Sequence, residues 1–241
     1  MDIKEYQNMA ELEGSLWWYR ALHEWILSKL GRTDLEGRTF LDAGCGSGGF
    51  IHILEHAFPA ENLIGLDIHP QALAFASTKT AAPLIRGTVD QIPLGTNSVD
   101  VVLSIDVLYH KRVDDRQALL EFSRCLKPRG RLILHVPAYQ WLYSYHDKFV
   151  HAKKRYTAQQ LRRELSAAGF VDIISGYRLG LLLPAVAIRR KLFGQPGSDV
   201  TQVPILLNKL FYRVAKLEQL LASKGWSIPF GSSAWAIARN P

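Results

Sequence analysis

Short apolar runs alternate along the chain with segments whose apolar residues recur at helical spacing. The apolar runs predict seven strands, at residues 39–44, 62–67, 83–87, 99–106, 131–136, 171–177 and 234–239. The helical segments predict helices over residues 48–58, 70–78, 116–126 and 157–168, with Thr157 as the N-cap of the last helix and Gly169 as its end. Strands that alternate with helices predict an α/β fold with a mostly parallel sheet covered on both faces.

Two regions interrupt this alternation. Residues 1–37 precede the first strand and contain an aromatic segment at 17–19, so we expect an N-terminal helical lid. Residues 178–232 separate the last two strands, so we expect a helical cap inserted there. The core domain is then formed by residues 38–177 and 233–241.

The expected cap contains an apolar stripe at helical spacing, bounded by Pro204 near its start and Gly225 past its end. The stripe consists of Val203, Leu206, Leu207, Leu210, Val214, Leu217 and Leu221. We expect it to pack against the sheet domain; the alternative is a helix that lies on a membrane surface.

The composition is that of a globular protein. The 241 residues are 48% hydrophobic and 21% charged, which excludes disordered and fibrous classes. No apolar run reaches the roughly 18 residues that a membrane-spanning helix needs. Two cysteines cannot staple a chain of this size, and no apolar stretch follows the N-terminus, so we expect a cytoplasmic protein.

The net charge of +7 is unevenly distributed. Residues 1–147 contain 14 basic residues (Lys and Arg) and 18 acidic residues (Asp and Glu). Residues 148–195 contain 10 basic and 2 acidic residues, and residues 196–241 contain 5 basic and 2 acidic residues. The basic block at 148–195 suits an acidic partner, which includes a phosphorylated substrate, a nucleic acid or a membrane surface. A solvated basic face is the alternative interpretation.

The candidate chemistry begins where the first predicted strand runs into a glycine-rich turn. Residues 41–48 read Leu-Asp-Ala-Gly-Cys-Gly-Ser-Gly, and Asp67 ends the next strand, where a carboxylate can accept both hydroxyls of a ribose. A dinucleotide and an S-adenosyl nucleoside both fit this arrangement. Asp42 favours the second, because a carboxylate there repels a pyrophosphate and suits the ammonium group of a methionine tail.

These residues resemble the class I S-adenosylmethionine-dependent methyltransferases over about residues 39–177. The resemblance rests on five motifs in the expected order, at residues 41–48, 65–68, 87–94, 98–104 and 126–134. It implies a Rossmann-like sheet of seven strands with the last strand antiparallel. It also implies S-adenosyl-L-methionine as the cofactor and S-adenosyl-L-homocysteine as the product.

The resemblance implies a set of cofactor-binding residues, in which Asp90 meets the adenine amino group and Val89 lies against the ring. The set is Asp42, Gly44, Gly46, Gly48, Asp67, Ile68, Val89, Asp90, Gln91, Ser104 and Tyr19. The segments at 17–19 and 146–156 are similar to small-molecule methyltransferases of polysaccharide and secondary-metabolite pathways. The 55 residues between the last two strands depart from the close hairpin usual in the superfamily.

Methyl transfer requires the acceptor to be aligned, water to be excluded and one proton to be handled. The candidate catalytic residues are His110, His146, Asp147 and His151, which follow the fourth and fifth predicted strands. The candidate substrate-binding residues are Tyr109, Tyr143, Arg155, Tyr156 and Trp18. His110 is either a base or a side chain that only lines the pocket, and we expect no metal.

We therefore expect S-adenosylmethionine-dependent methyl transfer to a small-molecule acceptor, with oxygen favoured over nitrogen or carbon as the methylated atom. The acceptor is expected to be partly apolar, because the cap is rich in leucine and aromatic residues, and to carry an acidic group. Peripheral contact with a membrane is a further expectation, and no nucleic-acid partner is expected. The alternatives are a nucleic-acid methyltransferase and a protein that binds the cofactor without transferring methyl groups.

Overall fold

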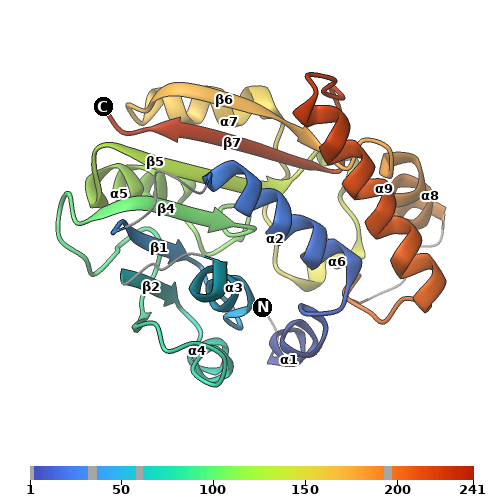
Figure 1. The fold of residues 1–241 in the computed structure, drawn as a ribbon, viewed down its shortest axis with the longest axis horizontal. Coiled ribbons are helices and arrows are strands. Elements are labelled where there is room, and N and C mark those ends of the chain that lie inside the picture. The colour runs from blue at the N-terminus through green and yellow to red at the C-terminus, as the bar shows by residue number, and fades with distance from the viewer. Residues whose placement is uncertain (1–2, 32–36, 58–61, 193–196) are drawn as a thin grey trace.

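The computed structural model describes residues 3–31, 37–57, 62–192 and 197–241, which fold around a seven-stranded sheet (Figure 1). The strand order is β3-β2-β1-β4-β5-β7-β6. All neighbours pair in parallel except β7, which is antiparallel to both β5 and β6. The expected Rossmann-like mixed sheet with an antiparallel last strand is confirmed. The bounds are β1 (Thr39–Ala43), β2 (Asn62–Asp67), β3 (Leu84–Arg86), β4 (Val99–Ile105), β5 (Leu126–Pro137), β6 (Val171–Arg178) and β7 (Ser233–Arg239).

Helices cover both faces of the sheet, as its doubly buried central strands require. One face packs against α5 (Asp115–Cys125) and α7 (Ala158–Ala167). The other face packs against α2 (Trp17–Leu30) and α3 (Gly49–Ala57). The edge strand β3 lies beside α4 (Pro70–Ala76), and η1 (Gln140–Leu142) and α6 (Tyr145–Phe149) follow β5.

The ends of α7 confirm the capping expected from its sequence. The Thr157 hydroxyl oxygen accepts a hydrogen bond from the Gln160 N–H at 3.1 Å. Gly169 follows the helix with a φ of +93°, a left-handed conformation that favours glycine. The seven predicted strands are all present, and β5 begins at Leu126, five residues before its predicted start.

The two helices that precede the sheet differ in their surroundings. In Figure 1, α2 crosses the front of the sheet, while α1 (Ile3–Leu12) lies below it, next to α4. Leu22, Trp25 and Ile26 of α2 pack with residues of β1, β4 and β5. The segment expected as a lid therefore contains one helix of the central core and one that covers the sheet's carboxyl end.

The insertion between β6 and β7 forms α8 (Leu183–Leu192) and α9 (Ile205–Ser223), at the right-hand side of Figure 1. Pro204 precedes α9, and Gly225 follows it with a φ of +88°. Tyr212 of α9 donates a hydrogen bond to the Glu24 carboxylate on α2 at 2.6 Å. Among the described residues, no helix is long and apolar enough to cross a membrane.

The expected packing of the α9 stripe against the sheet domain is wrong for most of its leucines. Leu206, Leu210 and Leu217 are 81%, 52% and 50% exposed. The reason is that α9 packs on α2 through a different face, which carries Phe211 and Ala215.

Candidate functional site

A cavity of about 540 Å³ lies at the carboxyl ends of β1, β2 and β4. Side chains of α1, α2, the turn after β1 and the insertion close around it. Parallel sheets bind ligands at this edge, beside the point where the strand order reverses. The cavity has two ends, which we call the cofactor end, around the glycine turn, and the acceptor end, around Asp106 and α8.

Backbone hydrogen bonds fix the glycine turn at the cofactor end. The Gly44 N–H donates to the Leu66 carbonyl oxygen at 2.7 Å, and the Gly46 N–H donates to the Asp67 carboxylate at 3.0 Å. Gly44 has a φ of +99°, and a Cβ there would collide with the Val107 side chain. Both glycines line the cavity. The predicted Gly48 does not line the cavity. A Cβ added at Gly48 would lie 2.8 Å from Ala76 of α4, so the glycine allows close packing against that helix.

Three carboxylates gather at the cofactor end: Asp42 at the end of β1, Asp67 at the end of β2 and Glu13 after α1. Burial, followed by the charges of Asp67 and Glu13, raises the pKa of Asp42 to about 7. Burial also raises the pKa of Asp67, although the N–H groups of His69 and Gly46 oppose the shift. No described side chain donates a hydrogen bond to the Asp42 carboxylate. A cavity with this charge suits a cationic group.

Glu13 is a cofactor-end residue that sequence analysis missed. Its carboxylate accepts a hydrogen bond from the Ser47 hydroxyl at 2.8 Å and pairs with Lys79. A Cβ at Gly49 would collide with the same carboxylate, so Glu13 lies directly on the start of α3. These contacts join residues 34 and 66 positions apart, and no local pattern marks them.

The other predicted cofactor residues divide into two groups. Tyr19, Ile68, Val89 and Asp90 line the cavity. Gln91 and Ser104 do not: Gln91 is exposed, and the Ser104 side chain is fully buried within β4. Ser104 faces the interior because β4 is buried on both of its faces.

Asp106 and the buried His135 form a pair at the acceptor end, which sequence analysis also missed. Asp106 follows β4 with a φ of +55°, and its two carboxylate oxygens each lie 3.2 Å from His135 Nδ1. His135 lies on β5, is fully buried, and its Nε2 has no partner among the described residues. The ring of Trp18, predicted to bind substrate, lines the cavity and lies 6.2 Å from the His135 ring. Asp106 also lines the cavity.

His110 lies in the cavity wall, stacked on Tyr109 with ring centroids 4.3 Å apart. His110 Nδ1 is 2.9 Å from the Val150 carbonyl oxygen, so that nitrogen carries the proton and Nε2 is the acceptor. Burial lowers the pKa of His110 to about 4. The imidazole is therefore neutral at pH 7 and is a weak base.

The predicted His–Asp pair at 146 and 147 is not formed, because Asp147 binds an arginine. Its carboxylate accepts hydrogen bonds from Arg155 Nε at 2.7 Å and Nη2 at 3.0 Å, and both side chains are 2% exposed. Arg155 was predicted to bind substrate, and this contact commits it to Asp147 instead. Both residues still border the cavity.

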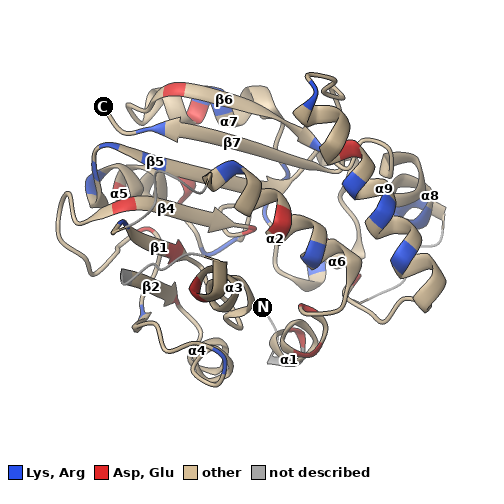
Figure 2. Ribbon diagram, viewed as in Figure 1, with Lys and Arg blue, Asp and Glu red and all other residues tan. Residues whose placement is uncertain are grey.

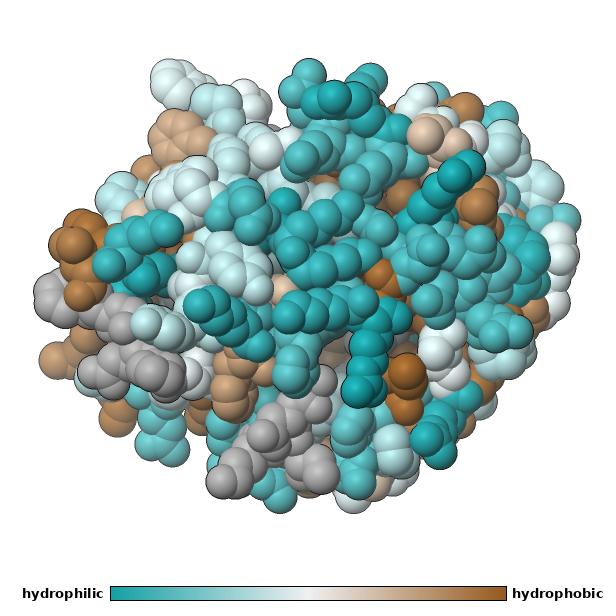
Figure 3. Space-filling view, turned by 180° about the vertical axis from the view of Figure 1, so that it is seen from behind, coloured by the Kyte–Doolittle hydropathy of each residue, from teal (hydrophilic) through white to brown (hydrophobic). Residues whose placement is uncertain are grey.

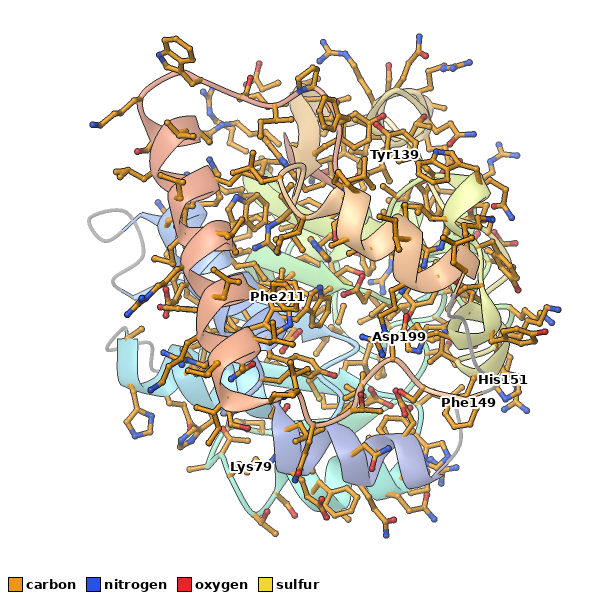
Figure 4. All side chains as sticks on the ribbon, turned by 90° about the vertical axis from the view of Figure 1, so that its right-hand side faces the viewer. Lys79, Tyr139, Phe149, His151, Asp199 and Phe211 are labelled. Carbon is orange, nitrogen blue, oxygen red and sulfur yellow. The ribbon has the colours of Figure 1, made fainter. Side chains whose placement is uncertain are left out.

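The side chain of His146 contacts the chain segment that follows α8. His146 Nδ1 accepts a hydrogen bond from the Asp199 N–H at 3.0 Å, and the Asp199 carboxylate lies 2.8 Å from Arg190 Nη2. Figure 4 labels Asp199 between α8 and α1. Arg190 was not singled out from the sequence, although it belongs to the basic block at 148–195. An arginine and a histidine thus converge at the acceptor end.

The remaining predicted residues lie at different depths. His151 borders the cavity in a left-handed conformation, with a φ of +57°. Tyr143 and Tyr156 do not border it. The Tyr156 hydroxyl donates to Leu108 and Asp115 in the buried core, and the Tyr143 hydroxyl donates to the Ala152 carbonyl oxygen at 2.9 Å.

Comparisons with known proteins agree with this arrangement. Residues 41–134 match a family model described as a methyltransferase domain. A malonyl-[acyl-carrier protein] O-methyltransferase from Methylococcus capsulatus is 29% identical over 179 residues, which cover 70% of this chain and 62% of that protein. The chain therefore spans less than two thirds of the length of this curated relative.

Two solved structures share the fold. An S-adenosylmethionine-dependent methyltransferase from Mesorhizobium loti aligns with a TM-score of 0.62 and 15% identity, over 94% of this chain and 99% of that one. A geranyl diphosphate C-methyltransferase from Streptomyces coelicolor, solved with Mg²⁺, geranyl diphosphate and S-adenosyl-L-homocysteine, aligns with a TM-score of 0.61 and 15% identity, over 92% of this chain and 79% of that one.

Proposed function

We propose that this chain, which carries a methyltransferase domain of the class I S-adenosylmethionine-dependent superfamily, transfers a methyl group to a small-molecule acceptor. One observation carries the proposal: the cofactor end and the acceptor end belong to a single cavity. Its volume of about 540 Å³ falls within the roughly 300–1,000 Å³ of small-molecule sites. Such a volume suits a nucleoside cofactor beside a small acceptor.

We assign the cofactor's groups to Asp42, Asp67 and Asp90, which all line the cavity. Asp67 would accept the ribose hydroxyls, Asp90 the adenine amino group, and Asp42 the ammonium group of the methionine tail. The fit is best at Asp42, because a buried carboxylate with a raised pKa gains most from a cation beside it. The bound cofactor supplies an activated methyl group on a sulfonium.

The chain must then hold the acceptor in line, exclude water and take up one proton. Trp18, Tyr19 and Tyr109 supply apolar faces that exclude water around the acceptor end. We assign the proton to the Asp106 carboxylate: the acceptor oxygen loses its proton to Asp106 as it gains the methyl group. The hydrogen bond from His135 Nδ1 holds that carboxylate in the wall of the cavity.

Asp106 suits this role better than the predicted histidines. The His110 ring is stacked on Tyr109 and its Nδ1 donates to the Val150 carbonyl oxygen, so it is fixed within the cavity wall. His146 Nδ1 accepts the Asp199 N–H, so its other nitrogen carries a proton and acts as a donor. We assign His110 and His146 to acceptor binding and orientation.

The acceptor we propose is a hydroxyl compound with an apolar part and an acidic group. Arg189 and Arg190 both line the cavity wall at the acceptor end, and Arg190 is engaged with Asp199. Arg189 is 53% exposed, so its guanidinium is the one that an anionic group of the acceptor would meet. The named compounds of two similar proteins, a malonyl group and geranyl diphosphate, are both acidic. We propose oxygen as the methylated atom, and the Asp106 carboxylate in the cavity wall, which could accept a hydroxyl proton, supports this proposal.

Production of S-adenosylhomocysteine from S-adenosylmethionine tests the proposal. Purified protein is incubated with the cofactor and a panel of hydroxy acids of increasing apolar length, and methylation of the hydroxyl oxygen is followed by mass spectrometry. We expect methylated oxygen in at least one acceptor. Asp106→Asn should lower turnover by about a hundred-fold or more, since a positioned base contributes about 10²–10⁴-fold.

Binding of S-adenosylhomocysteine is the control for this experiment. Asp106→Asn should leave its affinity within about three-fold, because a proton acceptor acts on the chemical step. Full turnover by Asp106→Asn would reject Asp106 as the base. Binding of the product without turnover of any acceptor in the panel would support a binding protein instead.

A further inference from the structure

The insertion at residues 178–232 concentrates the exposed apolar side chains of the described structure. The described structure exposes 17 large apolar residues, and 11 of them lie within the 55 positions of the insertion. They are Leu181, Ile188, Leu192, Ile205, Leu206, Leu207, Leu210, Leu217, Leu220, Trp226 and Phe230. Figure 3 shows brown, apolar atoms at the left-hand edge of the molecule, the end that carries α8. Scattered exposed leucines are ordinary on a protein surface, but a concentration on one element marks an interaction site.

The exposed leucines of α9 form one face. Leu206, Leu210, Leu217 and Leu220 are separated by four, seven and three residues, which places them in one row along the helix. Arg213 lies in the same row between Leu210 and Leu217. The side of α9 that faces away from α2 therefore carries a row of leucines with an arginine among them. Packing on α2 alone does not require an apolar row on that side.

The insertion is also strongly basic. It holds eight Lys and Arg against two Asp and Glu, a net charge of +6, while the rest of the chain holds 21 against 20. Figure 2 shows the blue segments along α8 and α9. Both acidic residues are engaged within the protein: Glu218 is buried and accepts the Leu181 N–H, and Asp199 pairs with Arg190. Three of the basic residues are engaged as well: Arg178 is buried, Arg190 pairs with Asp199, and Lys216 pairs with Glu24. The outer surface presents the other five, Arg189, Lys191, Lys209, Arg213 and Lys224, together with the apolar side chains.

We propose that this surface, the outer side of α8 and α9 with Trp226 and Phe230, docks on an anionic lipid bilayer. A helix in the membrane interface buries an apolar face while basic residues contact the headgroups, and leucines interspersed with Lys209, Arg213 and Lys224 match that pattern. In Figure 4 both helices lie on the side that faces the viewer, so both can meet one flat surface.

Charge separates this occupant from the two competing ones. A second copy of the chain would place the exposed cations of two such surfaces against each other, and like charges oppose such an interface. These cations include Lys191, Lys209, Arg213 and Lys224. A nucleic acid would satisfy the basic residues but would leave the leucine row exposed to water or to phosphates. Only an anionic bilayer offers both an apolar layer and negative headgroups.

The docking surface adjoins the proposed acceptor end. The same helix α8 exposes Ile188 and Leu192 and contributes Val186, Arg189 and Arg190 to the cavity wall. An acceptor that resides in the bilayer would therefore reach the cavity along α8. This consequence rests on the proposed function, whereas docking itself does not.

Sedimentation of the full chain with lipid vesicles tests the docking. We expect binding to phosphatidylcholine vesicles that contain about one third phosphatidylglycerol, and at least ten-fold weaker binding to phosphatidylcholine alone. Leu206→Gln/Leu210→Gln should weaken binding to the anionic vesicles by about ten-fold or more. Lys209→Gln/Arg213→Gln should weaken it by about thirty-fold, because each basic residue contributes about 1 kcal/mol near an anionic surface.

Matched controls keep the result interpretable. Leu120→Gln removes a leucine that is 41% exposed on α5, outside the insertion, and should leave vesicle binding unchanged. Equal binding by the wild type and both double variants would overturn the proposal, as would the absence of binding to anionic vesicles. Dimerisation that Leu206→Gln/Leu210→Gln abolishes, seen by light scattering without vesicle binding, would assign the surface to a second copy. Titration with S-adenosylhomocysteine in the same samples shows separately whether the cofactor end is intact.

Discussion

The two ends of the cavity are held together by different kinds of contact. At the cofactor end, backbone N–H groups of a glycine turn bond to the next strand and to Asp67, over separations of about 20 residues. At the acceptor end, charged side chains from α6, α8 and the segments around them bond to one another. The first end is fixed by backbone shape, and the second by pairs of side chains. Substitutions can therefore change the acceptor end while the cofactor end stays as it is.

The largest expected effect is on stability and comes from breaking the buried ion pair between Asp147 and Arg155 at the acceptor end. Arg155→Ala leaves the Asp147 carboxylate buried, with the Ser144 N–H and hydroxyl as donors and Arg190 Nη1, at 3.4 Å, as the nearest cation. Removal of one partner of a buried ion pair costs about 3–5 kcal/mol, so we expect the free energy of unfolding in urea to fall by that amount. Affinity for S-adenosylhomocysteine in the folded fraction should change little.

A double substitution separates packing from charge at this pair. Arg155→Met/Asp147→Leu replaces both charges by apolar side chains, which proteins often tolerate without loss of stability. Recovery of more than half of the lost stability would assign the effect of Arg155→Ala to the uncompensated carboxylate. A double variant as unstable as Arg155→Ala would contradict that explanation.

The next largest effect is expected from a single methyl group at the cofactor end. Gly44→Ala forces a Cβ onto the Val107 side chain in a left-handed backbone conformation. Overpacking costs about 1–3 kcal/mol and the left-handed conformation about 1–2 kcal/mol, so we expect affinity for S-adenosylhomocysteine to fall by about a hundred-fold, measured by calorimetric titration.

Gly169→Ala is the matched control for that substitution. Gly169 has a φ of +93°, close to the +99° of Gly44, but nothing lies within 4 Å of its Cβ position. Gly169→Ala should lower the free energy of unfolding by about 1 kcal/mol and leave the affinity unchanged. Equal affinities for the two variants would show that the close contact with Val107 does not shape the cofactor end.

The same contrast explains how much of the protein could be predicted from its sequence. The strands and the glycine turn follow from local patterns, because the residues that form them are neighbours in the chain. Tyr156 was predicted to bind substrate as part of the segment at 146–156, yet its ring is fully buried and its hydroxyl bonds to Leu108. The face that a loop residue presents depends on distant packing, which no periodicity encodes.

Long-range pairs account for most of the missed residues. His135 lies on β5, and nothing in the local sequence distinguishes it from its neighbours. It reaches Asp106 because the register of β5 with β4 places it opposite Ile105, the residue before Asp106. Glu13 reaches Ser47 only because α1 lies below the sheet. The α9 leucines were expected to be buried, because periodicity gives the apolar face of a helix but not the side on which a partner lies.

A pH titration sharpens the account of the cofactor end. Burial raises the pKa of Asp42 to about 7, so below pH 7 the carboxyl is protonated in the free protein. A bound ammonium favours the carboxylate, so binding must release that proton. We expect affinity for S-adenosylhomocysteine to fall by up to about ten-fold for each unit below pH 7, and to level off above it. Asp42→Asn should abolish this slope, and an unchanged slope in that variant would move the titrating group elsewhere.

The smallest effect on the cofactor is expected from the opposite end of the same cavity. His146→Ala removes the acceptor of the Asp199 N–H, and Asp199 keeps its contact with Arg190. If the two ends are built independently, affinity for S-adenosylhomocysteine should stay within about three-fold, while turnover of an identified acceptor falls. Calorimetry and turnover on the same sample measure both. A ten-fold loss of cofactor affinity would mean that the segment around Asp199 couples the two ends, since His146 itself touches only the acceptor end.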